Sequence, residues 1–236
     1  MFRQTAHVYD LVYLASGKDY AAESAAVHEV IQTRNPGAST LLDVACGTGG
    51  HLHHLQDRYT VTGVDIDPAM LDQARAHLPG LPLVEADMRT VDLGNRFDAV
   101  VCLFSSIGYM ADTTELGAAI QAIARHLHPG GVLVVDGWVR SDSWRDGAPP
   151  HVDVASADGL RVVRVGRSRR ERNTTYLEMH HLIATCDHIE HVVEHHKLML
   201  FSHEEYLAAF TAAGLTVETL ESPMEGRDRY VGVLPG

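Results

Sequence analysis

The segment Leu41–Gly50, which reads LLDVACGTGG, constrains the fold more than any other stretch of the chain. The segment has an apolar run, then a turn with Gly47 and Gly49, then a helical segment. This order is typical of a strand–turn–helix unit whose backbone approaches a ligand. A dinucleotide-binding loop has another small residue three positions after the second glycine, because helix and strand pack closely there. Leu52 occupies that position, so the sequence disfavours a pyrophosphate ligand.

Short apolar runs alternate with helical segments from about residue 40 to residue 138. We expect strands at 40–46, 60–66, 81–86, 97–104 and 130–138, with helices at 49–59, 67–78 and 113–127. Asp67 and Pro68 are a typical N-cap and first residue for the second of these helices. The alternation predicts a doubly wound, mostly parallel, Rossmann-like α/β sheet. At 236 residues, the chain is expected to form a single domain, residues 1–236.

The pattern changes after Trp138, where long β-rich segments follow at 160–172, 174–186 and 189–201. We expect them to form an antiparallel β insertion, residues 145–201, laid against the main sheet. A helix should then cover 202–215, with Ser202 and Glu205 as a capping box and Gly214 at its end. Residues 216–222 and 228–234 are predicted to be an antiparallel strand pair at the sheet edge.

Composition limits the partners and the compartment. The formal charge of −12 disfavours broad nucleic-acid binding, which needs a surplus of Lys and Arg. Cys46, Cys102 and Cys186 are far apart, and two of them lie in apolar runs, as expected for reduced packing residues. No apolar run approaches the roughly 20 residues of a membrane span, and the N-terminal segment lacks a signal-peptide pattern. The sequence therefore predicts a cytoplasmic protein without a membrane partner.

Acidic residues follow two of the predicted strands. Asp65 ends the second strand, where a carboxylate can accept both ribose hydroxyls, and Asp87 with Met88 follows the third, in position for an adenine. An adenosine held without a diphosphate indicates S-adenosyl-L-methionine as the cofactor. Two alternatives stay open: Asp65 only caps the next helix, or Asp87 is only a turn residue.

The motifs LDVACGTG, GVDID, EADMR and FSSIGY together resemble those of class I S-adenosyl-L-methionine-dependent methyltransferases. The flanking segments VYDLVYLASGKDYAAE and AAFTAAGL, with FSSIGY, are similar to the TDP-3-aminosugar N,N-dimethyltransferases of macrolide sugar pathways, of the desosamine and mycaminose type. The resemblance extends over nearly the whole chain. It implies an N-terminal lid, residues 1–35, and a homodimer formed through the inserted sheet.

The resemblance also implies roles for individual residues. Tyr9 would close over the cofactor carboxylate, and the remaining cofactor contacts would be Ala45, Gly47, Gly49, Asp65, Ile66, Asp87, Met88 and Leu103. Substrate contacts would include Tyr13, Lys18, Ser106 and Trp138. The chain departs from the family pattern at residues 136–144, DGWVRSDSW, where Glu-Pro-Trp-Trp is usual, and at Phe2, where tyrosine is usual. Both departures leave the identity of the sugar open.

Methyl transfer to an amine needs a neutral, well-aimed nucleophile, so a sugar ammonium must first lose a proton. Tyr109, His180 and Asp136 are the candidates to accept it. Tyr109 could equally position the amine. His180 shares one face of a predicted strand with Glu178, and this face lies either toward the pocket or toward solvent.

Arginines are concentrated in one strand segment of this acidic chain: Arg161, Arg164, Arg167, Arg169, Arg170 and Arg172. One arginine guanidinium can donate two parallel hydrogen bonds to phosphate oxygens. The cluster therefore either binds a nucleotide diphosphate or forms a solvated strand face. The resemblance favours Arg167, Ser168 and Arg227 as diphosphate or thymidine contacts. The 16 histidines lie on both faces of predicted elements, so no metal site is expected.

We therefore predict an S-adenosyl-L-methionine-dependent N-methyltransferase that acts on the amino group of a TDP-linked aminosugar in antibiotic sugar biosynthesis, twice in succession. One alternative is a methyltransferase with another small-molecule oxygen, nitrogen or carbon acceptor. Another is a binding protein that uses the same pocket without catalysis.

Overall fold

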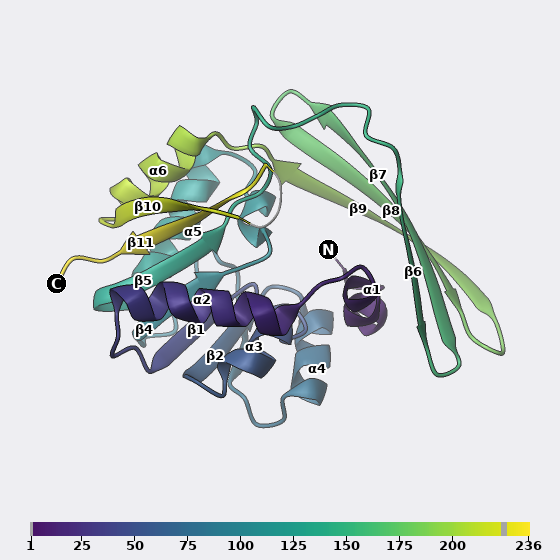
Figure 1. The fold of residues 1–236 in the computed structure, drawn as a ribbon, viewed down its shortest axis with the longest axis horizontal. Helices are drawn as coiled ribbons and strands as arrows, with labels where there is room; N and C mark the ends of the chain where they lie inside the picture. The colour runs from purple at the N-terminus through teal and green to yellow at the C-terminus, as the bar shows by residue number, and fades with distance from the viewer. Residues whose placement is uncertain (1, 223–225) are drawn as a thin grey trace.

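The computed structural model describes residues 2–222 and 226–236, and a seven-stranded sheet forms its centre (Figure 1). The parallel strands are β1 (Thr40–Val44), β2 (Thr60–Asp65), β3 (Leu83–Glu85), β4 (Phe97–Cys102) and β5 (Leu127–Asp136). With β10 (Thr216–Glu221) and β11 (Asp228–Val233), the strand order is β10-β11-β5-β4-β1-β2-β3. The predicted doubly wound, mostly parallel sheet is confirmed.

Helices cover both faces of this sheet. On one face lie α2 (Tyr20–Arg34), α3 (Gly50–Leu55) and α4 (Pro68–His77), and on the other α5 (Thr113–Ala124) and α6 (His203–Ala212). Helix α4 begins as predicted, because the Asp67 side chain accepts the N–H of Ala69 at 3.0 Å and Pro68 takes the first position.

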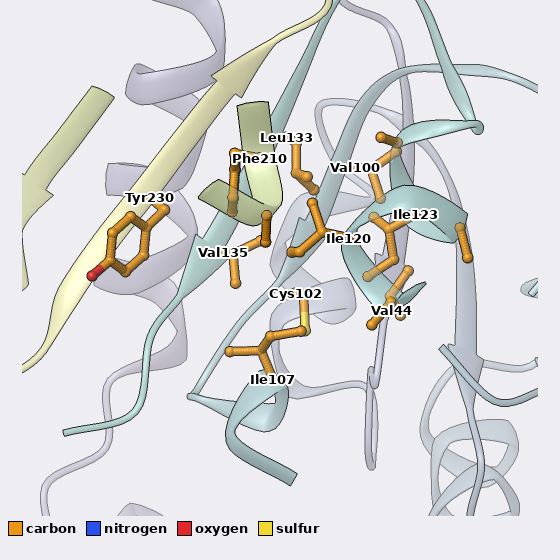
Figure 2. Close-up of a cluster of buried hydrophobic side chains, with 14 of the residues drawn as sticks. Val44, Val100, Cys102, Ile107, Ile120, Ile123, Leu133, Val135, Phe210 and Tyr230 are labelled. Carbon is orange, nitrogen blue, oxygen red and sulfur yellow. The ribbon is translucent and has the colours of Figure 1, made fainter. Parts of the chain in front are cut away.

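Alternating residues of the central strands divide the core into two halves. Figure 2 shows the half in which β1, β4 and β5 meet α5 and α6, with Val44, Val100, Cys102, Ile107, Ile120, Ile123, Leu133, Val135, Phe210 and Tyr230 labelled. Burying one such aliphatic or aromatic side chain contributes about 1.5–3 kcal/mol. This packing fixes the carboxyl ends of the parallel strands, where the side chains of the candidate site lie.

The C-terminal elements agree with the prediction. Ser202 Oγ accepts the N–H of Glu205, and Glu205 Oε2 accepts the N–H of Ser202 at 2.8 Å, which is the expected capping box of α6. Gly214 follows the helix with φ +82°. Strands β10 and β11 pair antiparallel, and β11 also pairs antiparallel with β5.

The inserted strands form a second, separate sheet of four antiparallel strands in the order β6-β7-β8-β9. They are β6 (His151–Ala157), β7 (Leu160–Glu171), β8 (Thr174–Ala184) and β9 (Ile189–Met199). Strand β6 was not predicted. The expectation that the insertion lies against the main sheet is wrong: its strands extend away from that sheet (Figure 1), and it contacts the rest of the chain mainly through α1 (Tyr9–Ala15) and η2 (Ser106–Tyr109).

The N-terminal segment connects the two sheets. The 3₁₀ turn η1 (Ala6–Val8) and helix α1 pack Val8 and Val12 against Ala155, Val162 and other apolar residues on one face of the inserted sheet, which we call its inward face. The three cysteines are free, with Cys46 and Cys102 buried and Cys186 exposed. Across residues 2–222 and 226–236, no helix has the length and apolar character needed to cross a membrane.

Candidate active site

The turn after β1 has a backbone conformation that favours glycine. Gly47 has φ +57° and Gly49 has φ +83°, and the intervening chain leads directly into α3. A Cβ atom on Gly49 would lie 2.7 Å from Cδ1 of Leu78, so packing as well as the backbone angle disfavours a side chain there. Ala45 adopts a positive φ of 61° in the same turn. The sequence LLDVACGTGG therefore forms the tight turn that it predicted.

Asp65, at the end of β2, is tied to this turn. Its Oδ2 accepts the N–H of Gly47 and its Oδ1 accepts the N–H of Asp67, each at 2.8 Å. Burial raises the pKa of Asp65, and the hydrogen bonds from the N–H groups of Asp67 and Gly47 act in the opposite direction. Asp67, not Asp65, caps α4. Each carboxylate oxygen can accept more than one hydrogen bond, so Asp65 retains acceptor capacity for a ligand diol.

A pocket opens at the carboxyl ends of β1, β2 and β3, and we call it the main pocket. The predicted residues that line it are Tyr9, Ala45, Gly47, Asp65, Ile66, Asp87, Met88, Ser106 and Tyr109. Residues that were not predicted as contacts also line it: Phe2, Val44, Asp67, Met70, Ala86, Arg89 and Met110. The strand-end rule for doubly wound sheets thus locates the pocket correctly.

A smaller cavity, which we call the loop cavity, lies beside the main pocket and shares Tyr9, Ala45, Gly47 and Ser106 with it. The predicted residue Leu103 lines this cavity and not the main pocket, whereas Gly49 lines neither and only shapes the turn.

Asp43 is an acidic residue of the loop cavity that sequence reasoning missed. It lies in β1 with 1% exposure, and its Oδ2 has no hydrogen-bond partner among the described residues. Burial raises the pKa of Asp43 well above its usual value. The signal was an acidic residue inside an otherwise apolar strand. A buried, unpartnered carboxylate of this kind suits a positively charged ligand group.

Asp87 is held by a neighbouring arginine. The Arg89 guanidinium binds both carboxylate oxygens of Asp87 and also reaches Glu115, and these hydrogen bonds from Arg89 lower the pKa of Asp87. Asp87 Oδ1 also accepts the N–H of Arg89, which is the turn role left open above. Asp87 therefore shapes its turn and lines the main pocket at the same time.

Aromatic rings from the N-terminal segment form one wall of the site. The ring centroids of Phe2 and Tyr9 are 4.9 Å apart, those of Tyr9 and Tyr13 are 4.6 Å apart, and those of Tyr13 and Phe104 are 5.1 Å apart. Lys18 Nζ lies 3.6 Å from the centre of the Phe104 ring. Burial lowers the pKa of Lys18, although its hydrogen bond to Glu23 opposes this effect.

Trp138 and Arg227, each predicted as a substrate contact, lie against one another. The Arg227 guanidinium lies 4.3 Å from the centre of a Trp138 ring, within the range of a cation–π contact. Arg227 Nη1 donates to Ser105 Oγ at 3.1 Å, and burial lowers the pKa of Arg227. Trp138 Nε1 donates to Thr175 Oγ1, which ties the pair to the inserted sheet.

Tyr109 belongs to η2 and lines the main pocket. Its hydroxyl lies 2.8 Å from Nδ1 of His196 on β9, a residue that the sequence did not single out. Burial raises the pKa of Tyr109. By contrast, Asp136, another proton-acceptor candidate, accepts hydrogen bonds from Arg229 Nε and from the N–H of Phe104, and it does not line the main pocket.

His180 does not face the pocket, and the expectation that it accepts a proton there is corrected. Alternate residues of β8 point to opposite sides of the inserted sheet. His180 lies on the outward face, across the sheet from α1, where it contacts Glu178 and stacks on His191.

Arg167 and Ser168 also lie away from the main pocket. Arg167 is paired with Glu178, and its side chain is 70% exposed. Both residues line a second surface depression with Glu178, His195 and His196. Neither Arg167 nor Ser168 lines the main pocket. The described residues contain no cluster of three or more His, Cys, Asp or Glu that could hold a metal ion.

Comparison with known proteins gives consistent matches. Residues 41–131 match the family model of a methyltransferase domain. A curated relative from Streptomyces venezuelae, dTDP-3-amino-3,4,6-trideoxy-alpha-D-glucopyranose N,N-dimethyltransferase, is 47% identical over 97% of each chain.

Two solved structures are also similar. The crystal structure of Streptomyces venezuelae DesVI superposes with a TM-score of 0.93, at 46% identity and 98% coverage of both chains. The structure of CalS10 with S-adenosyl-L-methionine bound, an amino pentose methyltransferase from Micromonospora echinaspora involved in calicheamicin biosynthesis, gives a TM-score of 0.87 at 40% identity and 96% coverage of both.

Proposed function

The chain belongs to the dTDP-aminosugar N,N-dimethyltransferases, a family of S-adenosyl-L-methionine-dependent methyltransferases, and from that membership we propose that it methylates the amino group of a dTDP-linked aminosugar in antibiotic sugar biosynthesis. The observation that carries this proposal is the 47% identity over 97% of both chains with a named N,N-dimethyltransferase. That relative acts on a 3-amino sugar by its name. We accordingly propose that this chain methylates the 3-amino group of its sugar substrate twice.

The residues of the two cavities fit S-adenosyl-L-methionine. This cofactor carries a positive sulfonium and an ammonium group, and the unpartnered Oδ2 of Asp43 offers a buried hydrogen-bond acceptor beside the glycine turn. Asp65 would accept the ribose hydroxyls, and Ile66, Asp87 and Met88 would enclose the adenine. Tyr9, which lines both cavities, would cover the carboxylate end, with Ala45, Gly47 and Leu103 around the loop cavity.

The chemistry needs few charged catalysts. Bound S-adenosyl-L-methionine supplies a methyl group on positively charged sulfur. The aromatic wall of Phe2, Tyr9 and Tyr13 excludes water and orients the two reactants, and such positioning accounts for much of the rate of a displacement. The Tyr109 hydroxyl would contact the amine, which makes Tyr109 the catalytic residue of this proposal, while Ser106 lines the same pocket.

The nucleotide sugar would enter between the N-terminal segment and the end of β5. Trp138 and Arg227 form a stacked, positively charged pair there, suited to a base and a diphosphate. Tyr13 and Lys18 come from the opposite side and reach Phe104. Arg167 and Ser168 line a second depression, which also includes His196, the hydrogen-bond partner of Tyr109.

We also propose that the N-terminal lid, residues 1–35, closes the site of a single domain, and that two copies form a homodimer. The outward face of the inserted sheet exposes a set of large apolar side chains: Val152, Val154, Val165, Leu182, Ile189 and Val193. Contiguous exposed apolar residues of this kind support an interface. A cytoplasmic location fits the free, buried Cys46 and Cys102, and the charge of −12 disfavours nucleic acid as a partner.

Activity on a panel of acceptors tests the proposal. Mass spectrometry of dTDP-3-amino and dTDP-4-amino sugars, incubated with the protein and S-adenosyl-L-methionine, counts the methyl groups added to each. Methylation of a free amine without the nucleotide at an equal rate would favour a different acceptor class. Binding of S-adenosylhomocysteine without transfer to any aminosugar would favour a binding protein.

A further inference from the structure

The inward face of the inserted sheet carries buried polar residues next to the main pocket. Glu194 and His196 on β9 are 5% and 4% exposed, and they alternate with the apolar Val192 and Leu198 on the same face. A buried carboxylate and a buried imidazole in an apolar row cost stability, so their presence requires an explanation.

These two residues lie in line with the Tyr109 hydroxyl. His196 Nδ1 is 2.8 Å from Tyr109 Oη, and its Nε2 is 3.9 Å from Oε2 of Glu194. Thr5 Oγ1 donates to the same Glu194 oxygen at 2.8 Å, and the Phe2 ring lies 4.4 Å from the imidazole ring. The line therefore runs from a pocket-lining hydroxyl through an imidazole to a carboxylate that the N-terminal segment covers.

The hydrogen bonding leaves capacity for a proton at the far end of this line. Within the described chain, Nε2 of His196 and Oε1 of Glu194 are buried without a hydrogen-bond partner. In a neutral His196, Nδ1 accepts the Tyr109 O–H and Nε2 carries the ring proton. The lone pairs of the Tyr109 oxygen are then free to accept a hydrogen bond from a group in the main pocket.

From this geometry, and resting on the function proposed above, we propose that Tyr109, His196 and Glu194 form a proton relay for the acceptor amine. A proton leaves the ammonium nitrogen for Tyr109 Oη as the phenolic proton moves to His196 Nδ1. The neutral amine then bonds to the methyl carbon while the sulfur–methyl bond breaks. Glu194 stabilises the imidazolium, which returns its proton through Tyr109 to water after the product leaves. Tyr109 is catalytic, and His196 and Glu194 act through it.

The relay predicts a specific pH dependence. The titratable groups that face His196 from neighbouring elements include Tyr109 from η2, Glu194 on β9 and His181 on β8, whereas Phe2 and Thr5 of the N-terminal segment do not titrate. Without the relay, only amine that is already neutral in solution can react. The rate of a relay-deficient variant should then rise tenfold per pH unit until the pH reaches the pKa of the amine. Primary amines have pKa values between about 8 and 10.4.

Steady-state kinetics of the full-length protein test this. We expect His196→Gln to lower kcat about 100-fold near pH 7, within the range for general acid–base catalysis, with a deficit that shrinks as pH rises. His181→Gln is the matched control, since it removes another buried histidine from the same face, on β8, without touching the Tyr109 hydroxyl. A deficit in His196→Gln that is constant with pH, or equal to that in His181→Gln, overturns the relay.

A second measurement needs no turnover and separates the relay from the choice of substrate. The histidine ring-proton resonance that disappears in His196→Gln identifies His196 in the NMR spectrum of the cofactor-bound protein. The relay predicts that Tyr109→Phe and Glu194→Gln each shift this resonance, because each variant removes a group that lies against the imidazole. A His196 resonance that either variant leaves unchanged contradicts the relay. Absence of aminosugar methylation by the unmodified protein contradicts the proposed function instead.

Discussion

Replacing Asp65 by asparagine tests how the glycine turn and the proposed ribose site are joined. In the native protein, the N–H groups of Gly47 and Asp67 each donate to one oxygen of Asp65 at 2.8 Å. Asparagine keeps one acceptor oxygen and directs an NH₂ group at the other donor. A hydrogen bond to a charged acceptor contributes about 1.5–3 kcal/mol. Burial raises the pKa of Asp65, which means that the buried charge itself costs stability. Removing this charge offsets part of the lost hydrogen-bond energy, so we expect a net stability loss of about 1–2 kcal/mol.

Ligand affinity should fall further than stability alone explains. Asp65→Asn would remove one of the proposed charge-assisted bonds to the ribose, about 1.5–3 kcal/mol, which corresponds to roughly 10–150-fold weaker binding. Isothermal titration calorimetry with S-adenosylhomocysteine measures the affinity, and thermal unfolding measures the stability.

Asp98→Asn is the matched control for this prediction. Asp98 accepts the N–H groups of Ser39 and Thr40 at 2.9 and 3.0 Å, at the amino ends of the strands and away from the pocket. This variant should lose stability and keep its affinity. Unchanged affinity in Asp65→Asn, or an equal loss of affinity in both variants, would refute the assignment of Asp65 to the ribose.

Three further predictions concern acidity, the turn and assembly. Burial raises the pKa of Asp65, so its ligand-binding charge is lost at higher pH than for an ordinary aspartate; calorimetric affinity should already decline on acidification above about pH 3.9, and constant affinity down to that pH contradicts this. Gly49→Ala forces a positive φ and a clash with Leu78, so thermal unfolding should show a loss of about 2–4 kcal/mol, and a loss under 1 kcal/mol argues against the strain. Leu182→Glu should convert the proposed homodimer to monomers in light scattering, and a native protein that is monomeric disproves the interface.

The strand-end residues could be predicted from the sequence because their position follows from topology. Asp65 and Asp87 come directly after apolar runs, and the doubly wound pattern places those ends at one edge of the sheet. The glycine turn is equally local, because Gly47 and Gly49 adopt positive φ angles that favour glycine. This preference can be recognised without knowledge of any tertiary contact. These signals located the pocket without any knowledge of the second sheet.

The inserted sheet could not be predicted to the same depth. Alternation shows that Glu178 and His180 share a face, but not which face meets the rest of the chain. On β9 the inward positions include the polar Glu194 and His196, so hydrophobicity does not mark the buried side. Strand β6 was missed for a related reason: Val152 and Val154 are 56% and 65% exposed. Tertiary contacts, those of His196 with Tyr109 and of Thr175 with Trp138, identify the inward face as part of the site.

Mass spectrometry of the reaction products tests the central claim most directly. Incubation of the protein with S-adenosyl-L-methionine and a dTDP-3-amino-deoxysugar should give first a singly and then a doubly methylated nucleotide sugar, with both methyl groups on nitrogen. If no methylated sugar forms while S-adenosylhomocysteine still binds to the protein, the account is contradicted.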